Sequence, residues 1–423
     1  MPPQSFDEGG INDCPPLRKM APMKRATFII LLLVSITFVF SFLLIKDNKL
    51  IVDETDHYPQ IKRFINRDFT LDPELTTIPG YHLILALFAS LLSLSSTSSI
   101  RFLSLLFSMF SVLTFFLFAK RIHPDSSLIK TLHYCFFPIL FPFFFLIYTD
   151  VFSLLLILLS SYTLLRRRYY LAGTIGTLSI LVRQNNVVWV VFLCMFNYLE
   201  EYGYRLNIET LKRWMKHCSF FLIGLVMFGI FLILNRGIAI GAGMMHPSFS
   251  FHLGNIYFML FLFFFLFLPL NISNLPKISL LLKRNWRIAI GVVCAFFIYM
   301  FTFVIDHPFN LQWADYFLRN RVLLFFSSTT LLKVLFFLPI AYSVLSIIVT
   351  KLWHKPFYLI YPFTFLYLIP SWLIEQRYYL IPFTLFILFR EERSKLVEYL
   401  SLVMYVAASS ALFVGIQRGM FFL

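Results

Sequence analysis

Carboxylates gather in one short polar stretch of an otherwise apolar chain. Only 13% of the chain is charged, yet residues 51–81 contain six acidic side chains: Asp53, Glu54, Asp56, Asp68, Asp72 and Glu74. Carboxylates beside a membrane span are costly unless they are solvated, paired or used in a reaction. A solvated loop tip would explain the same composition. Because the stretch is so polar relative to its surroundings, we interpret it as a reaction site.

The chemistry that these acids suit is the transfer of a sugar from a lipid phosphate. Such a sugar is an activated donor because the phosphate can leave, and an acceptor hydroxyl needs a carboxylate to take its proton. We expect Asp53 or Glu54 to be that base. Direct displacement with one base inverts the anomeric carbon, in contrast to a retaining scheme with two carboxylates.

A departing phosphate needs cationic partners, and the arginine fork is the best of these. Arg183 and Arg377 are the candidates, with His246 and His307 behind them. Each arginine taken alone is better explained by a structural ion pair or by snorkelling to the membrane interface, and it is their occurrence together on one face that favours a phosphate site. Asp150, in the run Tyr148-Thr149-Asp150, could orient the acceptor or bind a metal. Because one carboxylate is a poor divalent site, we predict no metal and no cofactor.

Composition places these residues in a membrane protein. The chain has 423 residues, is 59% hydrophobic and has a mean hydropathy of +0.79, which no soluble domain of this size could bury. The net charge of +15 is spread over short loops, as the positive-inside rule predicts, and does not indicate nucleic-acid binding. A polybasic lipid-binding patch at residues 166–168 is a weaker alternative. The five scattered cysteines indicate neither disulfides nor a zinc site.

The order of apolar and basic segments predicts an all-α polytopic fold with 11 to 13 membrane spans. Residues 1–25 form a disordered cytosolic N-terminus, and residues 26–423 form one membrane-embedded domain. Residues 46–100 are the first lumenal loop, in which the short apolar segment 81–92 suits an amphipathic interfacial helix. The predicted continuous spans are residues 26–45, 102–119, 131–148, 151–165, 220–234, 256–270, 288–305, 331–350, 357–374, 379–389 and 397–414.

Residues 171–182 and 187–198 are too short to span separately. Both ends of this pair adjoin basic loops, so we predict a broken hairpin with residues 183–186 at its outward tip. Polar backbone at membrane depth persists only where it lines a protein cavity.

The polar motifs also resemble those of a known family. They are Asp53-Glu54 with His57, Pro59 and Gln60; Asp72-Pro73 and residues 76–81; Arg101 within residues 99–108; Tyr148-Thr149-Asp150; residues 183–186 with Trp189; His307-Pro308 with Ala314-Asp315; and residues 376–379 with Pro382. In this order they are similar to the motifs of the dolichyl-phosphate-glucose-dependent alpha-1,2-glucosyltransferases, which add the terminal glucose to the lipid-linked oligosaccharide used in N-glycosylation.

The resemblance implies a GT-C glycosyltransferase fold, a catalytic acid in the first lumenal loop and inversion. It implies dolichyl phosphate glucose as donor, a dolichyl-diphosphate oligosaccharide as acceptor, and a lumenal active site in the endoplasmic reticulum membrane. The residues it adds to substrate binding are His57, Gln60, Asp72, Thr76, Thr77, Arg101, Tyr148, Gln184, Asn185, Asp315, Gln376 and Tyr378.

Two alternatives remain open at this point. A related transferase could use another polyprenyl-phosphate sugar or another acceptor, and could lie in a bacterial inner membrane. A transporter of lipid-linked sugars would explain the broken hairpin, but not a carboxylate-dense loop on one side.

Overall fold

The computed structural model describes residues 25–241, 250–312 and 315–423, and these residues fold into α-helices and short 3-10 helices. The described part of the chain has no β-strand, only two isolated bridges, Phe317–Phe422 and Leu352–Arg390. The expectation of an all-α fold is therefore confirmed. Residues 1–24, which make up nearly all of the predicted cytosolic N-terminus, lie outside the described residues.

Four helices of the described chain are long and apolar enough to cross a membrane, or six spans if each sharply bent helix pair counts as one. The four are α1 (Arg25–Ile45), α4 (Thr97–Ile122), α16 (Thr330–Val349) and α19 (Lys395–Gln417). The bent pairs are α9 (Ile208–His217) with α10 (Ser219–Asn235), at 74°, and α11 (Gly254–Leu266) with α12 (Leu268–Arg284), at 96°. The protein is a multi-pass membrane protein. The total of 11 to 13 spans depends on shorter apolar helices and stays a prediction.

The remaining helices are shorter. In the first half they are α2 (Glu54–Ile65), α3 (Gly80–Leu91), α5 (Ser127–Cys135), η1 (Phe141–Phe145), α6 (Thr149–Leu165), α7 (Tyr169–Val182), η2 (Gln184–Asn186) and α8 (Val187–Tyr202). In the second half they are α13 (Trp286–Thr302), α14 (Pro308–Gln312), α15 (Leu318–Ser327), η4 (Lys355–Leu359), α17 (Ile360–Leu368), η5 (Gln376–Tyr379) and α18 (Leu380–Phe389).

Local sequence explains where several long helices begin. Ser96, Thr329 and Ser394 each accept a hydrogen bond from a backbone N–H in the first turn of α4, α16 and α19. Hydroxyl side chains at this position satisfy donors that have no partner within the helix. On α1, apolar side chains such as Phe28, Ile36 and Phe40 are more than half exposed, as expected for a surface that faces lipid.

The predicted continuous span over residues 131–148 is wrong. Helix α5 ends at Cys135, and the chain reaches Tyr148 through an irregular segment and the 3-10 helix η1. Pro138 and Pro142 explain the break, because proline lacks a backbone donor and disfavours helical conformation in the residue before it. The predicted span 357–374 is also shorter as a helix, since α17 ends at Leu368, two residues before Pro370.

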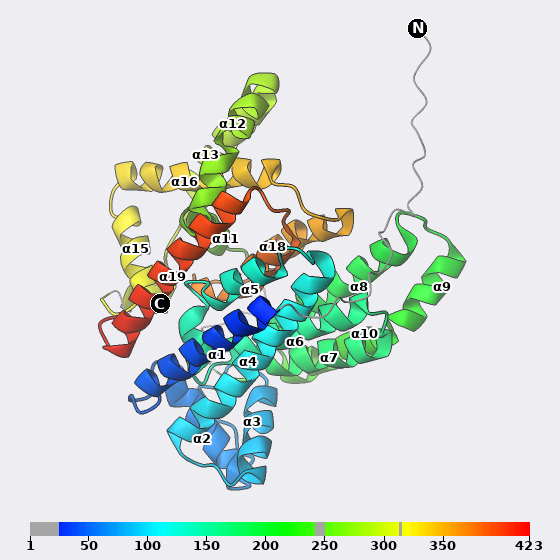
Figure 1. Cartoon of the computed structure of the whole chain (residues 1–423), viewed down its shortest axis with the longest axis vertical. Helices are drawn as coiled ribbons and strands as arrows, with labels where there is room; N and C mark the ends of the chain where they lie inside the picture. The colour runs from blue at the N-terminus through cyan, green and yellow to red at the C-terminus, as the bar shows by residue number, and fades with distance from the viewer. Residues whose placement is uncertain (1–24, 242–249, 313–314) are drawn as a thin grey trace.

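The first-half and second-half helices form two groups (Figure 1). The groups meet where α18 packs on α5 and α6, where α19 packs on α5 and η1, and where α8 packs on α17 and η4. In the first group α6 packs between α4 and α7, and α10 packs against α7. In the second group α16 packs against α11, α12 and α15. Helices α2 and α3 lie together at one end of the molecule (Figure 1). The break predicted within this pair is observed, since a non-α segment at residues 183–186 separates α7 from α8. The return of the chain to the same side of the membrane stays a prediction.

Candidate active site

Loops from distant parts of the sequence line one cavity of about 570 Å³. Its charged lining residues are Asp53, Asp56, Glu74, Arg183, Arg319, Glu375 and Arg377. Its polar and aromatic lining includes His57, Thr76, Thr77, Thr149, Phe309, Tyr316, Phe317, Tyr378 and Phe422. A concave site with a few convergent charged groups is the arrangement typical of binding and catalytic sites. Asp53, the candidate base, therefore lines the same cavity as Arg183 and Arg377, the candidate phosphate partners.

Asp53 stands at the N-terminus of α2 and pairs with Arg377 across the cavity. Its carboxylate accepts a hydrogen bond from Nη1 of Arg377 at 2.6 Å. The Asp53 backbone N–H donates to the hydroxyl of Tyr148 at 3.1 Å, and the Tyr148 hydroxyl donates to the Ile51 carbonyl at 3.1 Å. The Arg377 guanidinium lies 5.3 Å above the Tyr148 ring. Tyr148 therefore fixes both members of the Asp53–Arg377 pair.

The Asp53 carboxylate remains accessible despite this pairing, with 31% of its side chain exposed. Burial disfavours the charged form, but the charge and hydrogen bond of Arg377, together with the nearby His57 and Arg319, place the pKa of Asp53 below its usual value. Asp53 is consequently a carboxylate at neutral pH. In this state it can accept a proton from a hydroxyl group.

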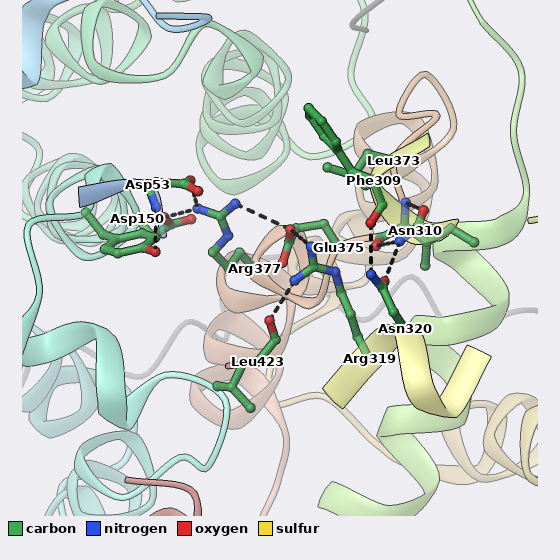
Figure 2. Close-up of polar contacts among 12 residues, drawn as sticks. Asp53, Asp150, Phe309, Asn310, Arg319, Asn320, Leu373, Glu375, Arg377 and Leu423 are labelled. Atoms are coloured by element: carbon green, nitrogen blue, oxygen red, sulfur yellow. Dashed lines mark hydrogen bonds and ion pairs between the residues drawn. The ribbon is translucent and has the colours of Figure 1, made fainter. Parts of the chain in front are cut away.

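Arg377 is the centre of an ion-pair network that Figure 2 shows. Besides Asp53, its Nη1 lies 3.7 Å from Oδ2 of Asp150, and its Nη2 lies 3.3 Å from Oε2 of Glu375. Asp150 also pairs with Arg183. Arg183 comes from the tip of the broken hairpin and Asp150 from the first turn of α6. The tip of the hairpin, the first turn of α6 and η5 therefore meet in one network.

Sequence reasoning missed Arg319 and Glu375 as site residues. Arg319, in the first turn of α15, lies 3.0 Å from Oε2 of Glu375, and its guanidinium lies 4.1 Å from the Phe317 ring centre. Both side chains are at most 6% exposed, yet both border the cavity. The signal that could have found them is their position next to Asp315 and Gln376, in loops that the charge bias predicts to face outward.

Two asparagines hold Glu375 in place. Asn255, at the start of α11, accepts a hydrogen bond from the Glu375 backbone N–H at 3.0 Å and donates to the carbonyls of Ser371 and Leu373. Asn310 exchanges hydrogen bonds with the backbone of Ile374 and also donates to the side chain of Asn320 (Figure 2). The segment before η5 is therefore anchored on both sides.

Asp56 is a further cavity residue that the sequence did not single out. It lies one turn after Asp53 on α2. Burial, followed by repulsion from Asp53, raises the pKa of Asp56 above its usual value. Two neighbouring carboxyl groups with opposite pKa shifts are a common feature of sites that move protons.

Glu54 does not reach the cavity. Its side chain is fully buried in a bidentate pair with Arg101, whose Nε donates to Oε1 at 2.9 Å. The backbone N–H groups of Ile51 and Ile147 donate to the same carboxylate at 2.9 and 2.8 Å. Arg101 also donates to the carbonyls of Ile45, Lys46, Asn48 and Lys49. The structure therefore corrects the prediction for both residues: they join the end of α1, the first loop and α4 and face no substrate space.

His57, a predicted substrate-binding residue, lines the cavity, and its environment keeps the ring neutral. Its Nδ1 lies 3.0 Å from Nε2 of His82. Burial lowers the pKa of His57 to about 4, although the nearby Asp53 carboxylate favours protonation. At neutral pH, His57 can therefore donate or accept a hydrogen bond but adds no charge.

Three predicted binding residues instead organise the first loop. The Gln60 amide donates to the Thr70 carbonyl at 3.0 Å and accepts from the Asp72 backbone N–H at 2.8 Å. Asp72 pairs with Arg63 at 3.3 Å. The Gln184 amide donates to the carbonyls of Thr76 and Ile238 and accepts from the Ile78 N–H. None of the three is among the described residues that line the cavity, whereas Thr76 and Thr77 are.

A close backbone contact completes the support for Thr76 and Thr77. The N–H groups of Ile240 and Gly241 donate to the carbonyls of Thr76 and Leu75 at 3.2 and 2.9 Å. A Cβ atom at position 241 would lie 2.0 Å from the Pro73 carbonyl oxygen, so only glycine permits this approach.

The other predicted site residues separate into two groups. Tyr378 lines the cavity, with the Arg183 guanidinium 6.0 Å from its ring centre. Asn185, His307, Asp315 and Gln376 do not line it: Asn185 donates to the Tyr367 hydroxyl, His307 is buried against Trp372, Asp315 is exposed and Gln376 is buried. His246 lies outside the described residues. No group of three or more potential metal ligands occurs in the described ranges. The expected absence of a metal stays a prediction.

A multi-pass helical protein whose loops bring an accessible carboxylate and three arginines to one cavity has the features of an enzyme acting on an anionic, membrane-borne substrate. The chain belongs to the DIE2/ALG10 family, whose sequence model matches residues 47–207 and 202–388.

Named relatives agree with this assignment. The chain is 28% identical to "Dol-P-Glc:Glc(2)Man(9)GlcNAc(2)-PP-Dol alpha-1,2-glucosyltransferase" of Candida albicans, with 62% of each chain covered. It is 27% identical to the protein of the same name from Arabidopsis thaliana, with 80% of this chain and 85% of the relative covered. Among solved structures, ArnT from Cupriavidus metallidurans in the apo state aligns with a TM-score of 0.43 and 13% identity, over 94% of this chain and 77% of that one.

Proposed function

We propose that the protein is an inverting glucosyltransferase. It moves glucose from dolichyl phosphate glucose to the glucose-terminated, dolichyl-diphosphate-linked oligosaccharide and forms an α-1,2 bond. The family and the names of its relatives supply the substrates. The observation that carries the chemistry is the accessible carboxylate of Asp53 in the same cavity as Arg183, Arg319 and Arg377.

In this reaction one bond forms and one breaks at the anomeric carbon. The acceptor hydroxyl oxygen attacks that carbon while its proton passes to the Asp53 carboxylate. The bond between the anomeric carbon and the phosphate oxygen breaks, and dolichyl phosphate leaves with the electron pair. Attack opposite the leaving group inverts the configuration, so an α product requires a β-linked donor.

The three arginines suit the negative charge that grows on the phosphate during this step. Preorganised donors aimed at a developing charge stabilise the transition state more than the ground state. Arg377 has an additional effect because it also holds Asp53. A phosphate that draws Arg377 away from Asp53 raises the pKa of that carboxyl group and makes Asp53 a stronger base when the donor is in place.

The remaining polar lining suits sugar hydroxyl groups. Thr76, Thr77, His57 and Tyr378 offer neutral donors and acceptors around the carboxylate. Neutral groups can orient a sugar without competing with the phosphate for the arginines. We assign them to the two reacting glucose units.

We place the active site on the lumenal side of the endoplasmic reticulum membrane, in agreement with the basic residues of the short loops on the other side. Asp68 provides a direct test because it is followed by Phe69 and Thr70 in the first loop. Asp68→Asn creates the acceptor sequence for N-glycosylation, which is modified only in the lumen. A glycan on the variant supports this orientation, and an unmodified variant in cells that glycosylate a lumenal control protein contradicts it.

The activity itself is tested with the full chain purified in lipid nanodiscs. Dolichyl phosphate glucose and the doubly glucosylated lipid-linked oligosaccharide should give a product one glucose longer with an α-1,2 terminal linkage, identified by mass spectrometry and linkage analysis. Cells lacking the protein should accumulate the oligosaccharide one glucose short. Transfer from a different lipid-linked sugar, with none from dolichyl phosphate glucose, would overturn the proposed donor.

A further inference from the structure

The segment after α19, residues 418–423, turns back towards the cavity. Two glycines permit the turn. Gly419 adopts a φ of +69°, which L residues with side chains rarely adopt. A Cβ at Gly415 would lie 2.4 Å from the ring of Phe421. The backbone N–H groups of Gly419 and Met420 then close the turn on the carbonyls of Ile416 and Gly415.

After the turn the segment pairs with the chain that leads into α15. The Phe422 N–H donates to the Tyr316 carbonyl at 3.0 Å, and the Leu318 N–H donates to the Phe422 carbonyl at 2.8 Å. Phe422 and Leu423 are almost completely buried, with 1% and 4% of their surface exposed. Such contacts fix the position of both segments, although they are more than 100 residues apart in sequence.

Phe422 connects this segment to the Asp53 side of the cavity. Its ring borders the cavity and stacks on Tyr148 with a centroid distance of 5.9 Å and an angle of 27°. Tyr148 in turn accepts the Asp53 N–H and lies under the Arg377 guanidinium. A shift of the Tyr148 ring would therefore move Asp53 and Arg377 relative to each other.

Leu423 connects the same segment to the arginines. Its backbone oxygen accepts a hydrogen bond from Nη1 of Arg319 at 2.6 Å. Figure 2 shows the continuation: Arg319 reaches Glu375, and Glu375 reaches Arg377. One continuous network therefore runs from the Leu423 backbone oxygen through Arg319, Glu375 and Arg377 to Asp53.

We propose that Phe422 and Leu423 form a positioning element of the active site, in which Phe422 sets the place of Tyr148 and Leu423 sets the place of Arg319. This inference rests on the proposed function, since it assigns the segment a part in the same reaction. The segment contacts no reacting atom itself. Its effect passes through Tyr148 to the base and through Arg319 to the phosphate.

A positioning role predicts two effects that loss of stability alone does not produce. If Tyr148 moves, Arg377 holds Asp53 less well, the pKa of Asp53 rises, and the acid limb of the pH–rate profile moves to higher pH. If Arg319 moves, dolichyl phosphate binds more weakly even without an acceptor.

The experiment compares Phe422→Ala with Met420→Ala in the full chain in nanodiscs. Met420 belongs to the same segment but is 63% exposed, so it is a matched control. We expect Phe422→Ala to lower kcat roughly 10- to 100-fold, as displaced catalytic groups do. We also expect it to shift the acid limb upwards and to weaken binding of dolichyl phosphate, measured by the thermal shift that this lipid causes. Met420→Ala should match the wild type in all three measurements.

If Phe422→Ala does not fold, Phe422→Leu tests the positioning role instead. Leucine fills much of the space of phenylalanine but cannot stack on Tyr148. A shifted acid limb in Phe422→Leu supports the proposal. A Phe422→Leu protein that matches the wild type in rate, pH profile and lipid binding shows that Phe422 only fills space, and it overturns the proposal.

Failure of the proposed function would look different. If the wild type binds dolichyl phosphate, and Phe422→Leu weakens that binding, but no glucose is transferred to the oligosaccharide, then the assigned reaction is wrong while the positioning element stands. If the wild type transfers glucose and all three variants match it, the positioning element is wrong while the reaction stands.

Discussion

Two consecutive residues, Asp53 and Glu54, each pair with an arginine, but the two pairs differ in burial, in hydrogen bonding and in whether the arginine is shared. The Glu54–Arg101 pair is fully buried, and backbone groups satisfy both partners. The Asp53–Arg377 pair borders a cavity, keeps 31% of the aspartate side chain exposed, and shares its arginine with Asp150 and Glu375.

The difference shows how the same chemical pair serves either structure or reaction. A buried pair with complete hydrogen bonding is costly to break and has no capacity left for a substrate. An arginine divided between three carboxylates in a cavity can exchange one of them for a phosphate with less loss. The first pair therefore fixes the loop, and the second is available for chemistry.

Removing the Asp53 carboxylate should have the largest effect on activity. Asp53→Ala should lower transfer about 10²- to 10⁴-fold, which is the usual contribution of a general base. Alanine is the better choice because asparagine at this position would create a glycosylation sequence with Glu54 and Thr55. The initial rate of glucose transfer at saturating donor is the measurement.

Asp47→Ala is the matched control for this variant. Asp47 lies in the same loop, but its side chain is 70% exposed and it is not among the described residues that line the cavity. The control should retain full activity. If Asp53→Ala keeps more than a tenth of the wild-type rate, another group is the base, and Asp56 is the next candidate because it lines the same cavity.

For Glu54 we expect a loss of stability with little loss of activity, the opposite of what we expect for Asp53. Glu54→Gln leaves the buried Arg101 without a counter-ion, which should cost about 3–5 kcal/mol of stability. Thermal unfolding in detergent measures this effect. The fraction that remains folded should transfer glucose with a kcat close to that of the wild type. A stable Glu54→Gln protein with no activity would reverse the roles of the two acids.

His57, one turn after both acids, should make the stability of the protein depend on pH. We expect this effect to be smaller than those of the Asp53 and Glu54 variants. The folded-state pKa of about 4 lies below the value of about 6.5 for an unfolded chain. The unfolded state therefore binds a proton first, and stability is lost as the pH falls from about 6.5 towards 4. Between pH 7 and pH 5 this difference amounts to about 2 kcal/mol for one histidine.

His57→Gln removes that contribution while it keeps a side chain able to hydrogen bond with His82. The drop in unfolding temperature between pH 7 and pH 5 should therefore be smaller in the variant than in the wild type. Equal drops in the two proteins would mean that His57 titrates normally and is less enclosed than its 7% exposure indicates.

The sequence was sufficient to find the main elements of the site. Composition and charge bias gave the helical membrane fold, and the crowding of acids in an apolar chain gave the loop that contains Asp53. The two arginines of the broken hairpin and of η5 could be predicted to meet because polar groups at membrane depth need a shared cavity. These features depend on local composition and on general rules for membranes.

Other features depend on contacts between distant residues, which one sequence does not contain. Asp53 and Glu54 are neighbours of the same type, and only the fold shows that one faces the cavity and the other Arg101. The roles of Gln60 and Gln184 could not be separated from substrate binding, because an amide that holds a loop and an amide that holds a sugar look alike in a motif. Arg319 and Phe422 could not be connected with the site until α15 and the segment after α19 were placed beside it.

Asp315 should show the smallest effect, and it tests whether position in a motif is enough to assign a role. The described hydrogen bonds at this residue run from the Arg321 side chain to the Asp315 backbone oxygen, which a substitution does not remove. Its side chain is exposed and is not among the described residues that line the cavity. Asp315→Asn should therefore change kcat and the KM for either lipid by less than about twofold, because surface substitutions of this kind have small effects. A loss of tenfold or more would mean that the carboxylate joins the site when substrate binds, and the distinction drawn between Asp53 and Glu54 would then have to be tested in the substrate-bound state as well.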